Sequence, residues 1–126
     1  QATSTSTSWS TTGLEATITP KFATSKILIQ VSGPMTGFAG GGDHQRGGLK
    51  IYRGGSGGTS VESSSNGLSC QYSTHSTYSD VHILHLDSPN TTSATTYKLQ
   101  GACYGSQTMY INRTSTMNAP MNLSSS

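Results

Sequence analysis

Short segments in which apolar and polar residues alternate recur along this chain, and no segment shows a 3.6-residue apolar period of useful length. Alternation with a period of two predicts half-buried β-strands. The clearest segments are residues 14–18, 26–32, 49–53, 81–86, 96–104 and 109–112, and a further strand is expected within 59–79 without a definite register. Seven or eight short strands predict an all-β fold with no significant helix, in the form of an antiparallel β-sandwich or jelly-roll-like domain.

Proline and glycine mark the expected boundaries between these strands. Pro20 should end the first strand because it has no N–H to donate to a sheet. Gly54–Gly58 (GGSGG) and Asp87–Asn90 (DSPN) are typical of turns. The stretch Gly33–Gly48 holds seven glycines and predicts a long loop, and long loops without secondary structure are usually functional or disordered.

The length of 126 residues suits one domain, which we place at residues 13–126 after a Ser/Thr-rich extended segment at residues 1–12. Because the first residue is Gln1 and not Met, we expect a fragment of a longer protein or a processed product. No signal peptide is recognisable, and no apolar run approaches the ~20 residues of a membrane helix.

Charged residues make up only 10% of the chain, against about 25% in an average domain, and Ser, Thr and Gly take their place. The net charge is +2, and the lysines and arginines are scattered. A nucleic-acid-binding protein is expected to concentrate them in one stripe. We therefore expect no nucleic-acid partner.

No pattern of catalytic or metal-binding residues stands out. His82 and His85 lie in an expected strand, where residues i and i+3 point to opposite faces and do not readily share a metal. The chain has no G-x-S-x-G motif, and Asp43-His44 beside abundant serines is a weak basis for a triad. The acidic residues have simpler roles in turns or on the surface, and they are Glu15, Asp43, Glu62, Asp80 and Asp87. We expect a non-enzymatic protein without cofactor or metal.

The glycine-rich stretch lacks the Gly-Lys-Ser/Thr ending of a phosphate-binding loop. Its alternative roles are a plain connector or a binding loop that touches a sugar or another subunit. In the second case the contact residues would be Phe38, His44, Gln45 and Arg46.

Two kinds of covalent modification stay open. Cys70 and Cys103 either form one disulfide or remain two buried thiols. Asn90, Asn112 and Asn122 each begin an Asn-X-Ser/Thr sequence, the acceptor pattern for N-glycosylation. In so Thr-rich a chain such matches arise by chance, and a bacterial or phage product would leave them bare.

Several expected strands and turns together resemble a known family. The pieces that carry the resemblance, in this order, are Ser25–Ile29 (SKILI), Lys50–Gly54 (KIYRG), Leu86–Gln100 (LDSPNTTSATTYKLQ) and Tyr110–Arg113 (YINR). The chain is similar, over roughly Gly13–Arg113, to the C-terminal β-sandwich domain of tail-fibre and appendage proteins of marine and freshwater phages. The long third piece is the most specific of the four.

This resemblance implies a β-sandwich head on a fibre at the virion surface, outside the cell, often as a homotrimer, in contact with other virion proteins and with a host-surface glycan. It carries over no catalytic residues and implies no membrane insertion. Aromatic residues would stack on a sugar, pack between subunits or pack in the core, and they are Trp9, Phe38, Tyr72, Tyr78 and Tyr104. The compared domains usually end in one more apolar strand, so an open sheet edge is expected here.

Two other classes compete with this interpretation. The first is a purely structural protein, either a capsid decoration protein or a subunit of an extracellular filament assembled by strand exchange. The second is a polysaccharide depolymerase, which needs a pair of carboxylates in a groove, with Asp43 and Asp80 as the residues to mutate.

Overall fold

The computed structural model describes residues 2–4, 9–38, 45–54, 58–62, 67–73, 77–104 and 108–111. Within these residues the chain forms strands and no helix. The strands are β1 (Ala2–Ser4), β2 (Ser10–Ile18), β3 (Ile27–Phe38), β4 (Gln45–Arg53), β5 (Thr59–Ser60), β6 (Ser69–Ser73), β7 (Thr77–Asp87), β8 (Thr95–Tyr104) and β9 (Thr108–Ile111). The predicted all-β class is therefore confirmed.

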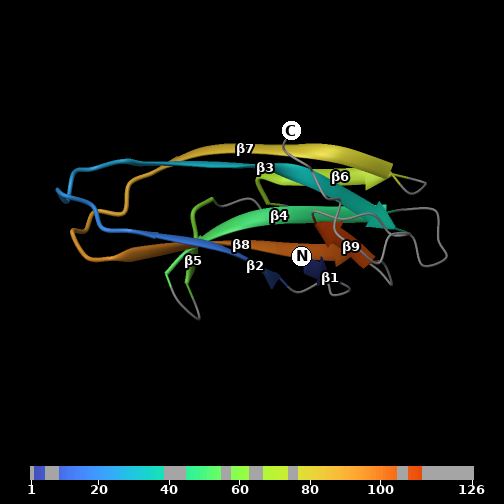
Figure 1. Cartoon of the computed structure of the whole chain (residues 1–126), viewed down its shortest axis with the longest axis horizontal. Helices are drawn as coiled ribbons and strands as arrows, with labels where there is room; N and C mark the ends of the chain where they lie inside the picture. Colours follow the sequence, from blue (N-terminus) through green and yellow to red (C-terminus); the bar gives the residue numbers. More distant parts are fainter. Residues whose placement is uncertain are drawn as a thin grey trace, which may run out of the picture.

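The strands form two antiparallel sheets that pack face to face as a β-sandwich. Sheet A has the order β1-β9-β3-β7, and sheet B has the order β2-β8-β4-β5, with β6 also pairing with β4. Figure 1 shows β3 and β7 together in one layer, with β4, β8 and β2 in the layer beneath them.

The pairing of the strands is that of a jelly roll. When the two-residue β5 is set aside, the first strand pairs with the last (β1 with β9), the second with the second last (β2 with β8), and so on through β3 with β7 and β4 with β6. The chain is thus one long antiparallel hairpin, which rolls up when β9 also pairs with β3 and β8 with β4. Eight strands rolled in this way make the double-sheet jelly roll.

Apolar side chains from both sheets fill the space between the layers. The buried cluster consists of Leu49 and Ile51 of β4, Val81 and Ile83 of β7, Tyr97, Leu99 and Cys103 of β8, and Met109 of β9. These residues occupy alternate positions of their strands, as the period-two pattern predicts. The core therefore lies where the sequence places its alternating apolar residues.

The long loop predicted for Gly33–Gly48 is wrong over most of its length. β3 continues to Phe38 and β4 begins at Gln45, so only residues 39–44 lie between the two strands, and these are outside the described part of the chain. The glycines in the strands have a packing role. A Cβ built on Gly47 would lie 2.7 Å from Sδ of Met109, and one on Gly101 would lie 2.5 Å from Cε of the same side chain. Glycine in these strands leaves room for Met109.

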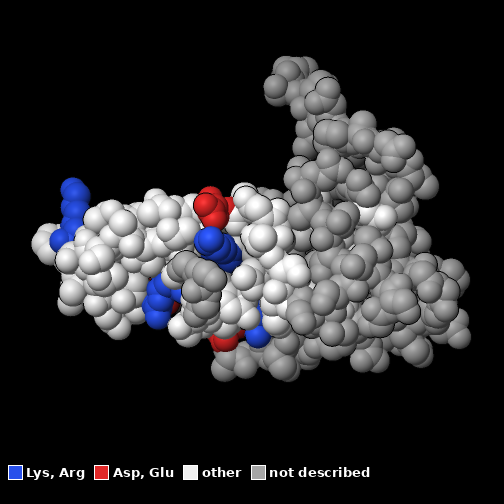
Figure 2. Space-filling model, turned by 90° about the horizontal axis from the view of Figure 1, so that it is seen from below, with Lys and Arg blue, Asp and Glu red and all other residues white. Residues whose placement is uncertain are grey.

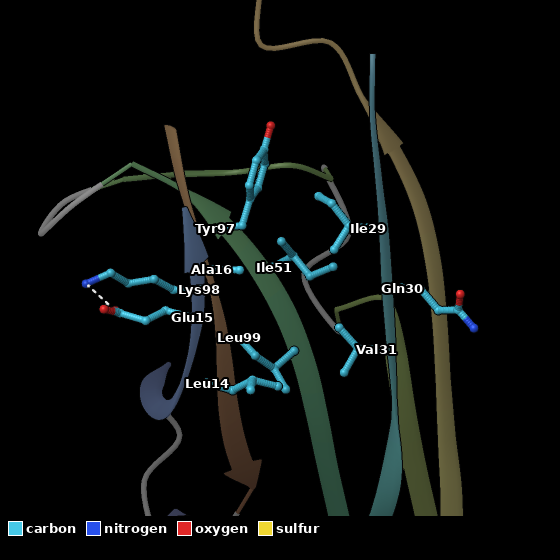
Figure 3. A pocket seen from close by; sticks show the side chains of 10 residues that line it. All are labelled: Leu14, Glu15, Ala16, Ile29, Gln30, Val31, Ile51, Tyr97, Lys98 and Leu99. Atoms are coloured by element: carbon cyan, nitrogen blue, oxygen red, sulfur yellow. Dashed lines mark ion pairs between the residues drawn. The ribbon is translucent and has the colours of Figure 1, made fainter. Parts of the chain in front are cut away.

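The Ser/Thr-rich N-terminal segment contributes strands to both sheets. Ala2–Ser4 pairs with Met109–Ile111 of β9, and the start of β2 pairs with Gln100 and Gly101 of β8. The register of β2 shifts between Thr11 and Glu15, where Gly13 has a φ of 81°. Leu14, beside this irregularity, points toward the space between the sheets in Figure 3 and is 55% exposed.

Candidate functional site

A partly buried ion pair joins the two sheets near one end of the sandwich. Nη1 of Arg53, on β4, donates to both carboxylate oxygens of Asp87, on β7, at 2.9 Å. The hydroxyl of Tyr97, on β8, donates to Oδ2 of Asp87 at 2.7 Å. Burial is the main cause that raises the pKa of the Tyr97 hydroxyl far above its ordinary value, and the hydrogen bond and negative charge of Asp87 add to it. The carboxylate of Asp87 is therefore a structural group that links three strands.

The two histidines lie as their strand positions predict. Both belong to β7, where His82 is exposed and His85 is half-buried on the face that carries Ile83. They point to opposite faces and do not approach a shared site. Within the described part of the chain, no group of three or more His, Cys, Asp or Glu residues is placed to hold a metal ion.

An apolar cleft opens between the sheets beside β2. Figure 3 shows apolar side chains of β2, β8 and β4 facing those of β3, while Glu15 and Lys98 lie on the outer side of their sheet and Gln30 on the far side of β3. The cleft has a volume of about 170 Å³, and its apolar lining residues are Leu14, Ala16, Ile29, Val31, Ile51, Tyr97 and Leu99. This volume is close to that of engineered apolar cavities, roughly 150 Å³, that accept benzene. The cleft can receive one apolar side chain.

A second apolar surface occupies part of the outer face of sheet A, next to exposed polar residues such as Gln30 and His82. Leu28 of β3 is 63% exposed, and Leu84 and Leu86 of β7 are 69% and 54% exposed. Leu28 and Leu86 are direct cross-strand neighbours, and Leu84 lies opposite Gln30. These three residues are called the leucine face below. Sheets that face water normally carry polar residues on the outer side, so this surface is a candidate contact site.

The leucine face has a signal in the sequence. In Val81–Leu86 (VHILHL), Ile83 and Leu84 are adjacent, so both faces of the strand carry apolar residues. The same holds for Ile27, Leu28 and Ile29 of β3. A strand that is apolar on both faces is typical of a sheet covered on both sides.

A hydrogen-bonded turn with an exposed phenylalanine lies at the end of the sandwich. Between β2 and β3, the N–H of Ser25 donates to the carbonyl of Phe22 at 3.0 Å, and the N–H of Phe22 donates to Oγ of Ser25 at 3.3 Å. Phe22 is nevertheless 68% exposed, and Lys21 and Lys26 beside it are exposed as well. Phe22 has no alternating apolar neighbours, and no signal in the sequence distinguishes it from an ordinary loop residue.

Trp9 has a packing role on the outer face of sheet B. The ammonium of Lys50 lies 4.8 Å from the centre of the Trp9 ring, within the range of a cation–π contact. Lys50 is only 8% exposed although its side chain is on the outer face. Of the aromatic residues singled out in the sequence, Trp9 is the one whose side-chain contact is described, and it stacks on a lysine of its own chain.

The residues predicted for the binding loop lie at strand ends. Phe38 is the last residue of β3, Gln45 and Arg46 are the first of β4, and His44 is outside the described residues. Phe38 pairs with Thr108, and Arg46 pairs with Tyr72 and Tyr104. The backbones of Phe38, Gln45 and Arg46 therefore belong to the sheets.

The two cysteines lie on the strands that flank β4. Cys70 is the register partner of Gly48, and Cys103 is that of Gly47 on the other side. Two strand spacings separate their Cα atoms by about 9.5 Å, whereas a disulfide needs less than about 7 Å. Cys103 is a buried thiol. The spacing favours two thiols over a bond between them.

Of the three predicted glycosylation positions, one is described. Asn90 is exposed in the turn between β7 and β8, where its φ of 52° fits the expected turn. Asn112 and Asn122 lie outside the described residues.

The charged side chains of the described region are dispersed. Figure 2 shows a few basic and acidic groups, some of them next to each other, on a face that is otherwise uncharged. One pair on this chain's surface joins Lys98 and Glu15 at 3.2 Å. Within the residues that the structure describes, no helix is long and apolar enough to cross a membrane.

No family model matches the chain, and neither a curated protein nor a solved structure matches it. The resemblance to the phage appendage domain stays a prediction from the sequence.

Proposed function

We propose that this chain is a non-enzymatic structural and adhesion module of a virion, the head domain of a tail fibre or similar appendage, which assembles as a homotrimer and contacts the host surface. The jelly-roll pairing supports the proposal because this architecture recurs in viral capsid and lectin domains. The low charge and abundant hydroxyl groups suit a hydrated, exposed surface. The four pieces of sequence that resemble the appendage family point the same way.

The observation that carries the assembly is the leucine face. Leu28, Leu84 and Leu86 are each more than half exposed in a chain that has only 31% hydrophobic residues. The cleft beside β2 is a second apolar surface of different shape. Two unlike surfaces on one chain allow head-to-tail contacts, which close into a ring when the rotation between subunits permits. A trimer is the ring that the family resemblance implies.

Labelling of intact virions tests the placement. Antibodies raised against the purified chain would be applied to virus particles from the same source and followed by immunogold electron microscopy. We expect gold at the ends of fibres or spikes. Gold along free filaments, or spread evenly over the capsid, would reject the appendage role.

One observation favours a second candidate, a filament or decoration protein assembled by strand pairing. Among the described strands, the 11-residue β7 pairs on one side alone, with β3. A long sheet edge is a template for another chain. This candidate predicts open-ended polymers rather than closed trimers, so the size of the purified assembly separates the two proposals.

A further inference from the structure

We propose that one end of the sandwich is a binding site for an anionic polysaccharide, with Phe22 as the stacking residue and Lys21 and Lys26 as the charge contacts. This inference rests on the proposed function as a host-surface module. It assigns the attachment site to the described turn at residues 19–26 together with the neighbouring loop 88–94. These two segments are called the positive tip below.

The strand register places the two segments of the positive tip side by side. Ile18, the last residue of β2, pairs with Thr95, the first residue of β8. Ile27, the first residue of β3, pairs with Asp87, the last residue of β7. Both connections therefore cross between the sheets at the same end of the molecule, and Figure 1 shows them together there.

The positive tip is held in shape by local contacts. The two hydrogen bonds between Phe22 and Ser25 close the turn at residues 22–25, and Pro20, two residues before it, is buried. In the loop, the N–H of Ser93 donates to Oγ1 of Thr91 at 3.1 Å, and the hydroxyl of Thr95 donates to the carbonyl of Ser93 at 3.1 Å. A site already held in place loses little conformational freedom when a ligand binds.

The charge of the positive tip has one sign. Lys21 and Lys26 are exposed, and residues 19–26 and 88–94 contain no Asp or Glu. The nearest acid along the chain, Asp87, is bound to Arg53 inside the sandwich and is only 8% exposed. The two ammonium groups therefore attract an anion without competition from an acid of these two segments.

The remaining groups match a sugar better than a lipid. Phe22 offers an aromatic ring, which packs against the apolar C–H face of a pyranose. The loop at the same end of the molecule has exposed polar side chains, at Asn90, Thr92 and Ser93, which can exchange hydrogen bonds with sugar hydroxyls. Phe22 is the one aromatic residue in the two segments, whereas interfacial membrane binding is built from several large apolar residues on one side.

Binding to two matched polymers tests the inference. The whole chain would be titrated with polygalacturonate and with its methyl ester, which has the same sugar but no carboxylate charge. We expect binding to polygalacturonate that weakens as salt is raised, because salt screens exposed charges, and binding to the ester that is at least about tenfold weaker.

Three variants locate the site. Phe22→Ala and the double variant K21Q/K26Q should each weaken binding by about tenfold or more. Phe22→Trp should retain binding because it keeps an aromatic face. Lys98→Gln removes a lysine on β8 that is paired with Glu15, and it should bind as the original chain does. Thermal unfolding of each variant identifies any that fails to fold. If Phe22→Ala fails to fold, K21Q/K26Q and Phe22→Trp still test the site.

Several results would overturn the inference. These are absence of binding to polygalacturonate, equal binding to both polymers, or unchanged binding in both Phe22→Ala and K21Q/K26Q. Preferential binding to phosphatidylglycerol vesicles, with Phe22→Leu as effective as the original residue, would assign the positive tip to a membrane instead. None of these results bears on the mass of the assembly or on its place on the virion. The proposed function is therefore tested separately, by those two measurements.

Discussion

At the scale of single residues, the contact between Arg53, Asp87 and Tyr97 shows how an ion pair can replace apolar packing where two sheets meet. The sequence predicts a turn or surface role for Asp87, whereas the structure makes it the last residue of β7 and leaves it only 8% exposed. The strand period that turns Val81 and Ile83 inward also predicts an inward direction for Asp87 and an outward one for Leu84 and Leu86. The partners of Asp87 have no signal in the sequence, because they are 34 and 10 residues away along the chain.

Loss of Arg53 should destabilise the fold markedly. Arg53→Met leaves the Asp87 carboxylate buried without its cation, and we expect a loss of about 2–3 kcal/mol in the free energy of unfolding, less than for a fully buried pair because Arg53 is 32% exposed. Urea denaturation measures it. Glu15→Gln, which breaks the exposed pair with Lys98, serves as control and should cost less than about 1 kcal/mol. Equal losses in the two variants would show that the partly buried pair of Arg53 and Asp87 has no special role.

Tyr97 should make stability depend on alkaline pH. Its pKa in the folded state is raised above the unfolded value of about 10, so the folded protein holds this proton more tightly. The contribution of Tyr97 to the free energy of unfolding is fully present below its pKa in the unfolded state. It is lost as the pH rises through its pKa in the folded state. Urea midpoints measured from pH 8 to 11 should fall above pH 10, and the fall should be smaller in Tyr97→Phe. A fall of the same size in that variant would contradict the assignment to Tyr97.

At the scale of strands and turns, the sequence predicts where strands exist better than where they end. Leu49–Arg53 and Val81–Leu86 are found within β4 and β7 because their alternation is clear. The glycines before Leu49 carry no alternation, so the extension of β4 back to Gln45 cannot be read from them. It is apparent in the structure because Met109 packs over Gly47 and requires the missing Cβ.

Gly67 offers a sharp test of a turn. Its φ is +86°, and a Cβ there would clash with the carbonyl oxygen of Leu49. Gly13 has a similar φ of +81° but open space around it, so Gly13→Ala reports the backbone cost alone, about 1 kcal/mol. Gly67→Ala should lose clearly more than Gly13→Ala in thermal or urea unfolding. Similar losses would mean that the segment before β6 does not pack against β4.

At the scale of the whole molecule, the all-β class can be predicted from the sequence, but the jelly-roll pairing of the strands cannot. Alternation identifies strands without saying which strands pair, and the jelly roll joins residues as distant as Ala2 and Ile111. The cleft beside β2 likewise depends on the pairing, because its lining residues come from strands of both sheets. The candidate surfaces therefore had to come from the fold, although the apolar residues that form the leucine face are visible in the sequence.

The mass of the assembly in solution tests the central claim most directly. Sedimentation equilibrium should give three times the 13.1 kDa of one chain. Leu84→Glu places a charge on the leucine face and should raise the dissociation constant by at least about tenfold. Thr59→Glu, which places the same charge at an exposed position on sheet B, should leave the mass unchanged. A single-chain mass at every concentration, or a trimer that Leu84→Glu does not weaken, would contradict the account.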